Sequence, residues 1–206
     1  AFLLGFFVAM IKINKVPVLS KIAAFYVSFT RGTPILVQLY LSYYGIPILL
    51  QYLNYYFGMN LNINSVPNVV FVLVAFALNE GAYASENIRA AILSVDKGQR
   101  EAALSIGMTT FQTYIHIIIP EALIVAIPSL GNEFINMIKS TSLAFVCAVV
   151  EMTAQGKLLA SRNVRYFEMY IALSLIYWAV TFVLARAFNF VERKLKRSEG
   201  EVTSRA

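Results

Sequence analysis

The sequence has very little of the chemistry that most enzymes use. It holds one cysteine, Cys147, and one histidine, His116, among its 206 residues. One cysteine excludes a disulfide framework within the chain, and no residue pairs with Cys147 as a metal or redox site. Neither a GxxxxGK[ST] phosphate-binding loop nor a GxSxG nucleophile elbow occurs. We therefore predict no catalytic residue, no metal site and no ATP chemistry in this chain.

Charge is also scarce, and no charged residue occurs between Gly32 and Asn79. The composition is 59% hydrophobic with a mean hydropathy of +0.67, too apolar for a soluble domain of this length. About 20 apolar residues cross the ~30 Å hydrocarbon core of a bilayer as a helix. The sequence therefore predicts an all-α protein that crosses the lipid bilayer several times. Its net charge of +6 is read first as an indication of membrane topology and not of a nucleic-acid partner, because Lys and Arg are enriched on the cytoplasmic side of membrane proteins.

The apolar segments predict a transmembrane bundle of about five crossings over residues 1–197. Residues 1–11 read as the end of a first crossing whose opening turns are missing, and residues 22–32 as an amphipathic segment before the second crossing. An outer or re-entrant segment is expected at 139–165, and a disordered cytoplasmic tail at 198–206. The expected crossings are 1–11, 34–53, 69–88, 117–138 and 167–190.

The distribution of Lys and Arg predicts which side of the membrane each loop occupies. With the C-terminus inside, 13 of the 17 cations fall on cytoplasmic segments. The hinge at 54–68 carries five asparagines and no charge, which indicates an external loop. The polar loop at 96–120 then lies in the cytoplasm. The four remaining cations all lie in the segment 139–165: Lys139, Lys157, Arg162 and Arg165.

The loop at 96–120 is the longest polar interruption in the chain, and its caps predict two short helices around a glycine. Asp96 and Gln99 have the spacing of a capping box, and Thr109 and Gln112 repeat it. Gly107 stands where a helix end favours a left-handed residue. The second helix is expected to run towards Pro120.

The first of these helices has a small, smooth face that suits a groove on another protein. Ala102, Ala103 and Ile106 recur there at helical spacing. Glu101-Ala102-Ala103 is followed after three residues by Gly107 and, after nine further residues, by Ile117, with Ile119-Pro120 closing the pattern. This pattern resembles the EAA loop of ABC-transporter permeases. The resemblance implies a coupling helix that an ATPase subunit holds, with Glu101, Ala102, Ala103, Gly107 and Pro120 as the coupling residues.

Polar side chains inside the crossings are expensive in lipid, so they usually face a cavity, a partner or a functional path. Asn79, Glu80 and Tyr83 can share one face of the third crossing with Asn87. Glu86 is three residues from Arg89, so we expect an intrahelical ion pair there. Glu133 and Lys139 in the fourth crossing are a further candidate pair, although six residues is poor spacing on one helix.

Three further stretches are similar to the polar amino acid permeases, the histidine/glutamine/arginine-type importers. The first is RGTP with LVQL at 31–39, and the second is LNEGAY at 78–83 followed by Glu86 and Arg89. The third is KSTSL at 139–143 with Glu151. This resemblance adds Lys139, Ser142 and Glu151 to the substrate-path candidates Asn79, Glu80, Tyr83 and Glu86. Glu80 departs from the pattern, because a small residue is commoner there, and an extra carboxylate in a cavity would suit a cationic substrate or part of one.

The resemblance implies a type I ABC importer permease in the cell inner membrane. Its partners would be ABC ATPase subunits that hold ATP and magnesium, a second permease chain (identical or a sister) and an extracytoplasmic amino-acid-binding protein. An ion-coupled secondary amino acid transporter is the alternative, although no internal repeat is visible. An intramembrane enzyme would need a nucleophile paired with a base, and no such pairing stands out in the sequence. A structural scaffold remains a further alternative, but it would give the buried carboxylates no function.

Overall fold

A computed structural model describes the backbone of residues 1–203 and the side chains of residues 1–195 apart from Asn64. All the regular elements in this range are helical, which confirms the all-α prediction. In chain order they are α1 (Phe2–Ile13), α2 (Leu19–Gly32), α3 (Ile35–Phe57), η1 (Ile63–Ser65), α4 (Asn68–Ser94), α5 (Lys97–Ser105), α6 (Thr110–Thr113), η2 (Tyr114–Ile118), α7 (Ile119–Ser140), η3 (Thr141–Cys147), α8 (Met152–Asn163) and α9 (Tyr166–Thr203).

Four helical segments in the described chain are long and apolar enough to cross a membrane. They are Ile35–Phe57, Asn68–Ser94, Thr110–Cys147 and Tyr166–Leu195, and each overlaps one expected crossing. Residues 1–11 fall in α1, whose 12 residues are shorter than the ~20 that a crossing needs. The count of five crossings therefore stays a prediction. Helix α9 continues to Thr203, within the tail for which disorder was expected, and residues 204–206 lie outside the described part.

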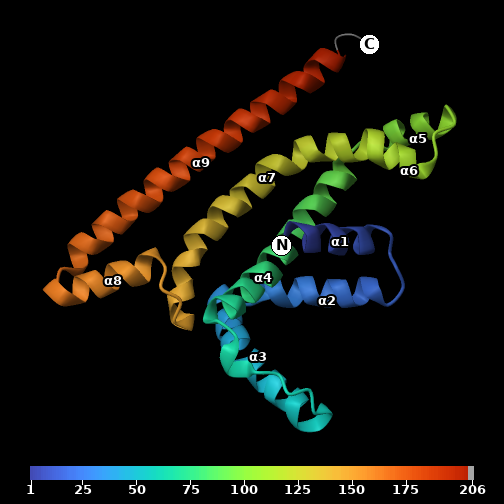
Figure 1. Ribbon diagram of the computed structural model, residues 1–206. Coiled ribbons are helices and arrows are strands. Elements are labelled where there is room, and N and C mark those ends of the chain that lie inside the picture. The colour runs from blue at the N-terminus through green and yellow to red at the C-terminus, as the bar shows by residue number, and fades with distance from the viewer. Residues whose placement is uncertain (204–206) are drawn as a thin grey trace.

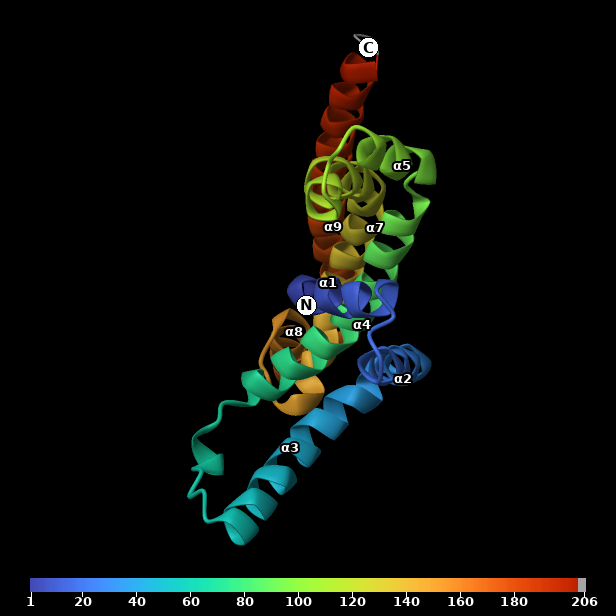
Figure 2. The same cartoon turned by 90° about the vertical axis from the view of Figure 1, so that its right-hand side faces the viewer.

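Helix α4 is the centre of the molecule, and α1, α2, α3 and α7 all pack against it (Figure 2). Three clusters of buried side chains follow its length. One joins it to α3 and η3 around Leu39 and Cys147, one to α7 around Ile92 and Ala122, and one to α1 and α2 around Ala82. Alanine dominates the second cluster, as expected where helices associate in lipid through close packing of small residues.

Helix α1 crosses α4 at very short range because small residues line the contact. A Cβ added to Gly5 would lie 2.9 Å from Ala84 Cβ and 3.1 Å from the Gly81 carbonyl oxygen. Helix α2 is fastened nearby, where the Tyr26 hydroxyl donates a hydrogen bond of 2.5 Å to the Leu78 carbonyl. Burial raises the pKa of Tyr26 to about 12, so this phenol keeps its proton and stays a donor at physiological pH.

The polar loop follows the predicted caps with one exception. The Asp96 side chain caps α5, as predicted, by accepting a hydrogen bond from the Gly98 amide. The expected capping box with Gln99 does not form, because the Asp96 carboxylate bonds Gly98 instead. Gly107 has φ +89°, which confirms its left-handed conformation. Thr109 and Gln112 form the predicted capping box, with bonds of 3.2 and 2.8 Å.

The second helix of the loop runs towards Pro120 as predicted, and it continues past this residue without a break. It passes through the π-helical turn η2 directly into α7, and Pro120 lies in the first turn of α7. Proline has no amide proton and its ring crowds the carbonyl one turn earlier. The wider π turn, in which the Ile119 amide bonds the Tyr114 carbonyl, lets the helix continue past it.

Between α7 and α9 the chain turns back through η3 and α8, at the place of the expected segment 139–165. Helix α8 packs against α9 and η3 and lies beside the beginning of α9 (Figure 1). Glu151 fixes where α8 begins, because its carboxylate accepts from the Thr153 and Ala154 amides at 2.7 Å each. Ala148 and Val164, which flank α8, both have φ of +55°.

Candidate functional site

A polar cavity of about 560 Å³ lies between the α2–α3 junction, α4 and α7. Gly32 ends α2 and Pro34 begins α3, so residues 31–35 make a sharp elbow that forms one wall. Asn79, Glu80 and Tyr83 come from the middle of α4, and Glu133 and Asn136 from α7. The shared face predicted for Asn79, Glu80 and Tyr83 is therefore a cavity wall in the structure.

A buried amide network holds the elbow against α4. The Gln38 side chain is 8% exposed. Its Nε2 donates to the Thr30 carbonyl at 2.7 Å and to Thr33 Oγ1 at 2.8 Å, which satisfies backbone and side-chain acceptors at the bend. Its Oε1 accepts from Asn79 Nδ2 at 3.0 Å. This hydrogen bond directs the Asn79 amino group towards Gln38, and Asn79 also lines the cavity.

Three charged side chains of the described residues line the cavity: Arg31, Glu80 and Glu133. The Arg31 guanidinium lies over the Tyr83 ring, 5.2 Å from its centroid. Glu133 Oε1 accepts from Asn87 Nδ2 at 3.4 Å. Glu80 is 6% exposed, and its Oε1 is buried without a hydrogen-bond partner. Among the described residues, no ion pair joins these three charges to one another.

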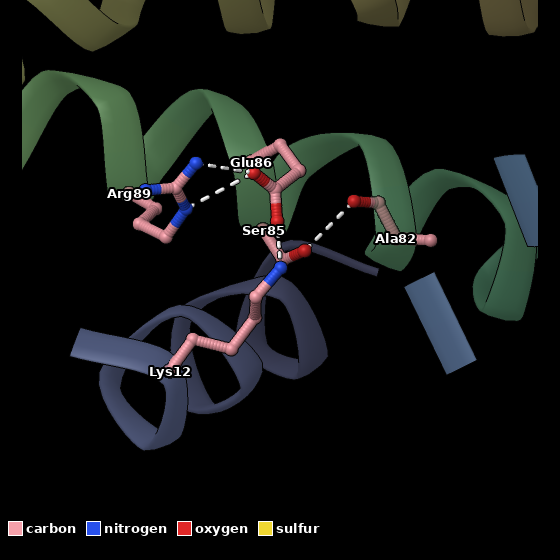
Figure 3. A network of polar contacts seen from close by, with 5 residues as sticks. All are labelled: Lys12, Ala82, Ser85, Glu86 and Arg89. Atoms are coloured by element: carbon pink, nitrogen blue, oxygen red, sulfur yellow. Dashed lines mark hydrogen bonds and ion pairs between the residues drawn. The ribbon is translucent and has the colours of Figure 1, made fainter. Parts of the chain in front are cut away.

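Glu86 belongs to a different network, on the side of α4 that faces α1 (Figure 3). Its Oε2 accepts from Arg89 Nε at 3.0 Å and Nη2 at 2.8 Å, which confirms the predicted intrahelical pair. Its Oε1 accepts from Lys12 of α1, a contact that sequence spacing could not reveal. Glu86 therefore ties α1 to α4 and does not line the cavity, although it was a substrate-path candidate.

The structure also places Lys139, Ser142 and Glu151 outside the cavity lining. Glu151 is the N-terminal cap of α8, a structural task that accounts for its carboxylate. Lys139 is exposed in the last turn of α7. The expected pair of Glu133 with Lys139 is not the contact that Glu133 makes, because α4 supplies Asn87 to this carboxylate instead.

Several polar residues that line the cavity were not among the predicted substrate-path candidates, above all Arg31, Glu133, Asn136 and Ser140. The signals were present. Arg31 opens the RGTP stretch, and Ser140 follows Lys139 in the KSTSL stretch. Glu133 stood out as a charge within a crossing, and Asn136 lies one helical turn beyond it. Among the described residues no group of three His, Cys, Asp or Glu side chains is placed to hold a metal ion.

The loop of α5 and α6 forms a second site at one end of α4 and α7 (Figure 1). Glu101, Ala102, Gly107 and Pro120 are exposed there. Ile106 is 80% exposed and Phe111 74% exposed, so two large apolar side chains stand out on this polar loop. Ala103 is 2% exposed and packs inside the chain, which removes it from the outward face expected from helical spacing.

Curated proteins similar to this chain are amino-acid permeases. It is 43% identical over 193 residues to the probable amino-acid permease protein YxeN of Bacillus subtilis, covering 94% of this chain and 82% of that one. It is 43% identical over 196 residues to the probable amino-acid ABC transporter permease protein PatM of Vibrio harveyi, covering 95% and 83%. The glutamine transport system permease protein GlnP of Escherichia coli is 34% identical over 177 residues, covering 86% and 76%.

Solved structures agree in fold. A crystal structure of an amino acid ABC transporter with histidines matches with a TM-score of 0.79 and 38% identity, covering 93% of this chain and 84% of that one. An inward-facing methionine transporter, MetNI, matches at a TM-score of 0.69 and 15% identity, covering 94% and 87%, which is a likeness of fold. These matches support a permease of the ABC importer type and not an ion-coupled secondary transporter. Residues 1–197 match the family described as "Binding-protein-dependent transport system inner membrane component", and the chain belongs to that family.

Proposed function

We propose that this multi-pass membrane protein is the translocation subunit of an ABC importer for polar amino acids, with the cavity as its substrate path. One observation supports the proposal above the others: the α5–α6 loop joins α4 directly to α7, and these two helices carry most of the polar wall of the cavity. A partner that moves the loop would move both walls. Force applied at one end of the bundle thus reaches the substrate site through continuous helices.

The loop offers a surface for an ATPase subunit. Ala102 leaves room for close approach, Glu101 offers a charge to a basic residue of the partner, and Ile106 and Phe111 supply exposed apolar area. Closure of an ATPase dimer would pull the loop and rock α4 and α7, alternating the access of the cavity between the two sides of the membrane. ATP and magnesium would be held by that partner, because this chain has no phosphate-binding loop.

The cavity wall has the groups that a free amino acid needs. Its α-carboxylate would pair with Arg31, and its α-ammonium with one of the two carboxylates. Asn79, Asn136 and Thr33 add neutral polar groups for the remaining hydrogen bonds. We place the loop and the C-terminus in the cytoplasm from the charge distribution. An external binding protein would deliver the substrate, and a second permease chain, identical or a sister, would complete the path.

ATP hydrolysis by the assembled complex tests this function. The complex of permease and ATPase, reconstituted in liposomes, would be measured with the binding protein empty and then loaded with single amino acids. Stimulation by a polar amino acid, together with its accumulation inside the vesicles, is the expected result. A nonpolar amino acid such as leucine is the control. Uptake that follows an ion gradient and needs no ATP would contradict the proposal.

A further inference from the structure

The charges lining the cavity do not balance for a neutral amino acid. Arg31 is the one cation on the wall that the structure describes, against the two carboxylates Glu80 and Glu133. A zwitterion brings one carboxylate and one ammonium group, which Arg31 and one glutamate would match. One carboxylate would then stay in the membrane interior without a counter-charge, at a high cost in free energy.

Glu80 is the cavity carboxylate with an oxygen atom that has no hydrogen-bond partner among the described residues. It is more than nine-tenths buried, lines the cavity from the centre of α4, and has an Oε1 to which no group of the described chain donates a hydrogen bond. Glu133 differs, because it accepts a hydrogen bond from Asn87. The Arg31 guanidinium makes a cation–π contact with the Tyr83 ring and forms no ion pair with Glu80. Buried polar groups in native proteins are normally satisfied, so an orphaned one at a cavity wall indicates a ligand.

We propose that Glu80 binds the cationic side chain of a basic amino acid, so that this importer carries substrates of the lysine, ornithine or arginine class. The inference rests on the proposed function and narrows its substrate. Arg31 then holds the α-carboxylate, Glu133 the α-ammonium and Glu80 the side-chain cation. Two negative charges and one positive charge on the wall meet two positive charges and one negative charge on the substrate, which leaves the filled cavity neutral.

Binding to the permease–ATPase complex in detergent, without the binding protein, tests the assignment. Omitting the binding protein matters because that protein has a selectivity of its own. Radiolabelled lysine, arginine and glutamine would be titrated against the wild-type complex and three variants. Glu80→Gln keeps the shape and removes the charge, Glu80→Asp keeps the charge, and Glu168→Gln neutralises a carboxylate at the start of α9, outside the cavity.

The wild-type complex is expected to prefer lysine and arginine to glutamine. Glu80→Gln should weaken lysine binding by about thirtyfold or more, as loss of one member of a buried charge pair does, with little change for glutamine. Glu80→Asp should keep much of the preference, and Glu168→Gln all of it. Co-elution of the ATPase subunit with each variant shows that the complex has assembled.

Other outcomes separate this inference from the function beneath it. Equal binding of lysine and glutamine by the wild type would overturn the role of Glu80 and leave an importer of polar amino acids standing. A Glu80→Gln complex that assembles but loses lysine and glutamine alike would place Glu80 at the α-ammonium and also overturn it. If no amino acid binds, and none stimulates ATP hydrolysis through its binding protein, the proposed function fails as well.

Discussion

The side chain of Gln38 joins three segments of the cavity wall, because its one amide bonds the end of α2, the elbow and Asn79 of α4. Replacing it with leucine would leave the Asn79 amino group and the Thr30 carbonyl without partners inside a membrane protein. We expect Gln38→Leu to lower the stability of the complex by about 1–3 kcal/mol. Thermal unfolding in detergent measures this loss. Gln51→Leu, an exposed position of the same helix, is the matched control and should melt like the wild type.

A second readout separates positioning from simple support. If Gln38 orients Asn79, then Gln38→Leu should also raise the KM for uptake more than it lowers kcat, since substrate binding depends on the cavity wall. A variant that melts and transports like the wild type would show that the network contributes nothing measurable.

Which residue contacts could be predicted depended on how far apart the partners lie in the sequence. The Glu86–Arg89 pair and the Thr109–Gln112 capping box span three residues, and helical geometry alone specifies them. The Lys12–Glu86 contact spans 74 residues, so only the packing of α1 on α4 creates it. The same limit hid Arg31 and Glu133, which enter the cavity from α2 and α7.

At the scale of helices, the crossing of α1 and α4 depends on the missing side chain of Gly5. A methyl group there would lie 2.9 Å from Ala84 Cβ and 3.0 Å from the Ser85 amide nitrogen, which is closer than these atoms can pack. The two helices would therefore have to separate. We expect Gly5→Ala to destabilise the protein by about 1–3 kcal/mol, the usual cost of overpacking. Gly45→Ala in α3 is the control, because nothing lies within 4 Å of its added Cβ. Helix propensity predicts that Gly45→Ala is neutral or stabilising by up to about 1 kcal/mol. Equal melting temperatures for the two variants would contradict this account of the crossing.

The coupling loop depends on a glycine for a different reason. No atom lies within 4 Å of a Cβ built on Gly107, but its φ of +89° is a conformation that side chains disfavour, above all β-branched ones. Gly107→Val should therefore shift α5 relative to α6 and reduce the amino acid transported per ATP hydrolysed, while the protein still reaches the membrane. The ratio of uptake to hydrolysis in liposomes measures this coupling, with Gly45→Ala as the control. Normal coupled uptake by Gly107→Val would exclude a role for the loop geometry.

Helix positions were more predictable than helix ends. Apolar runs located the four long helices, because burial in lipid requires them whatever the tertiary structure. The π-helical turn η2 between α6 and α7 was not predictable, because a proline ordinarily indicates a helix boundary or a kink. Here a π turn just before Pro120 accommodates the proline ring and its missing amide proton, so the helix continues. Whether a helix breaks or widens at a proline depends on the packing around it.

At the scale of the whole molecule, two polar ends lie on opposite sides of the bundle. The α5–α6 loop lies at the same end as the C-terminal part of α9, and the loop between α3 and α4 lies at the other end in both views (Figures 1 and 2). The sequence assigned the first two to the cytoplasm and the third to the outside by counting cations. The structure places the first two at one end and the third at the other, and which end faces the cytoplasm stays a prediction. The segment 139–165, which runs from the end of α7 through η3 and α8, is the strongest test of the assignment, because charge counting placed four cations there on the outer side.

Labelling with a membrane-impermeant maleimide decides this topology. The native thiol of Cys147 is fully buried, and a Cys147→Ala parent removes it altogether. In that background we expect Asn62→Cys, exposed between α3 and α4, to react in intact cells, and Arg100→Cys in α5 to react only after permeabilisation. Arg162→Cys, exposed at the end of α8, should react from outside. Labelling of Arg162→Cys only in permeabilised cells would put α8 on the cytoplasmic side, so that α9 would have to begin there as well. Its single crossing would then carry the C-terminus outside, against the basic residues that follow it, and the five-crossing topology would be wrong as a whole.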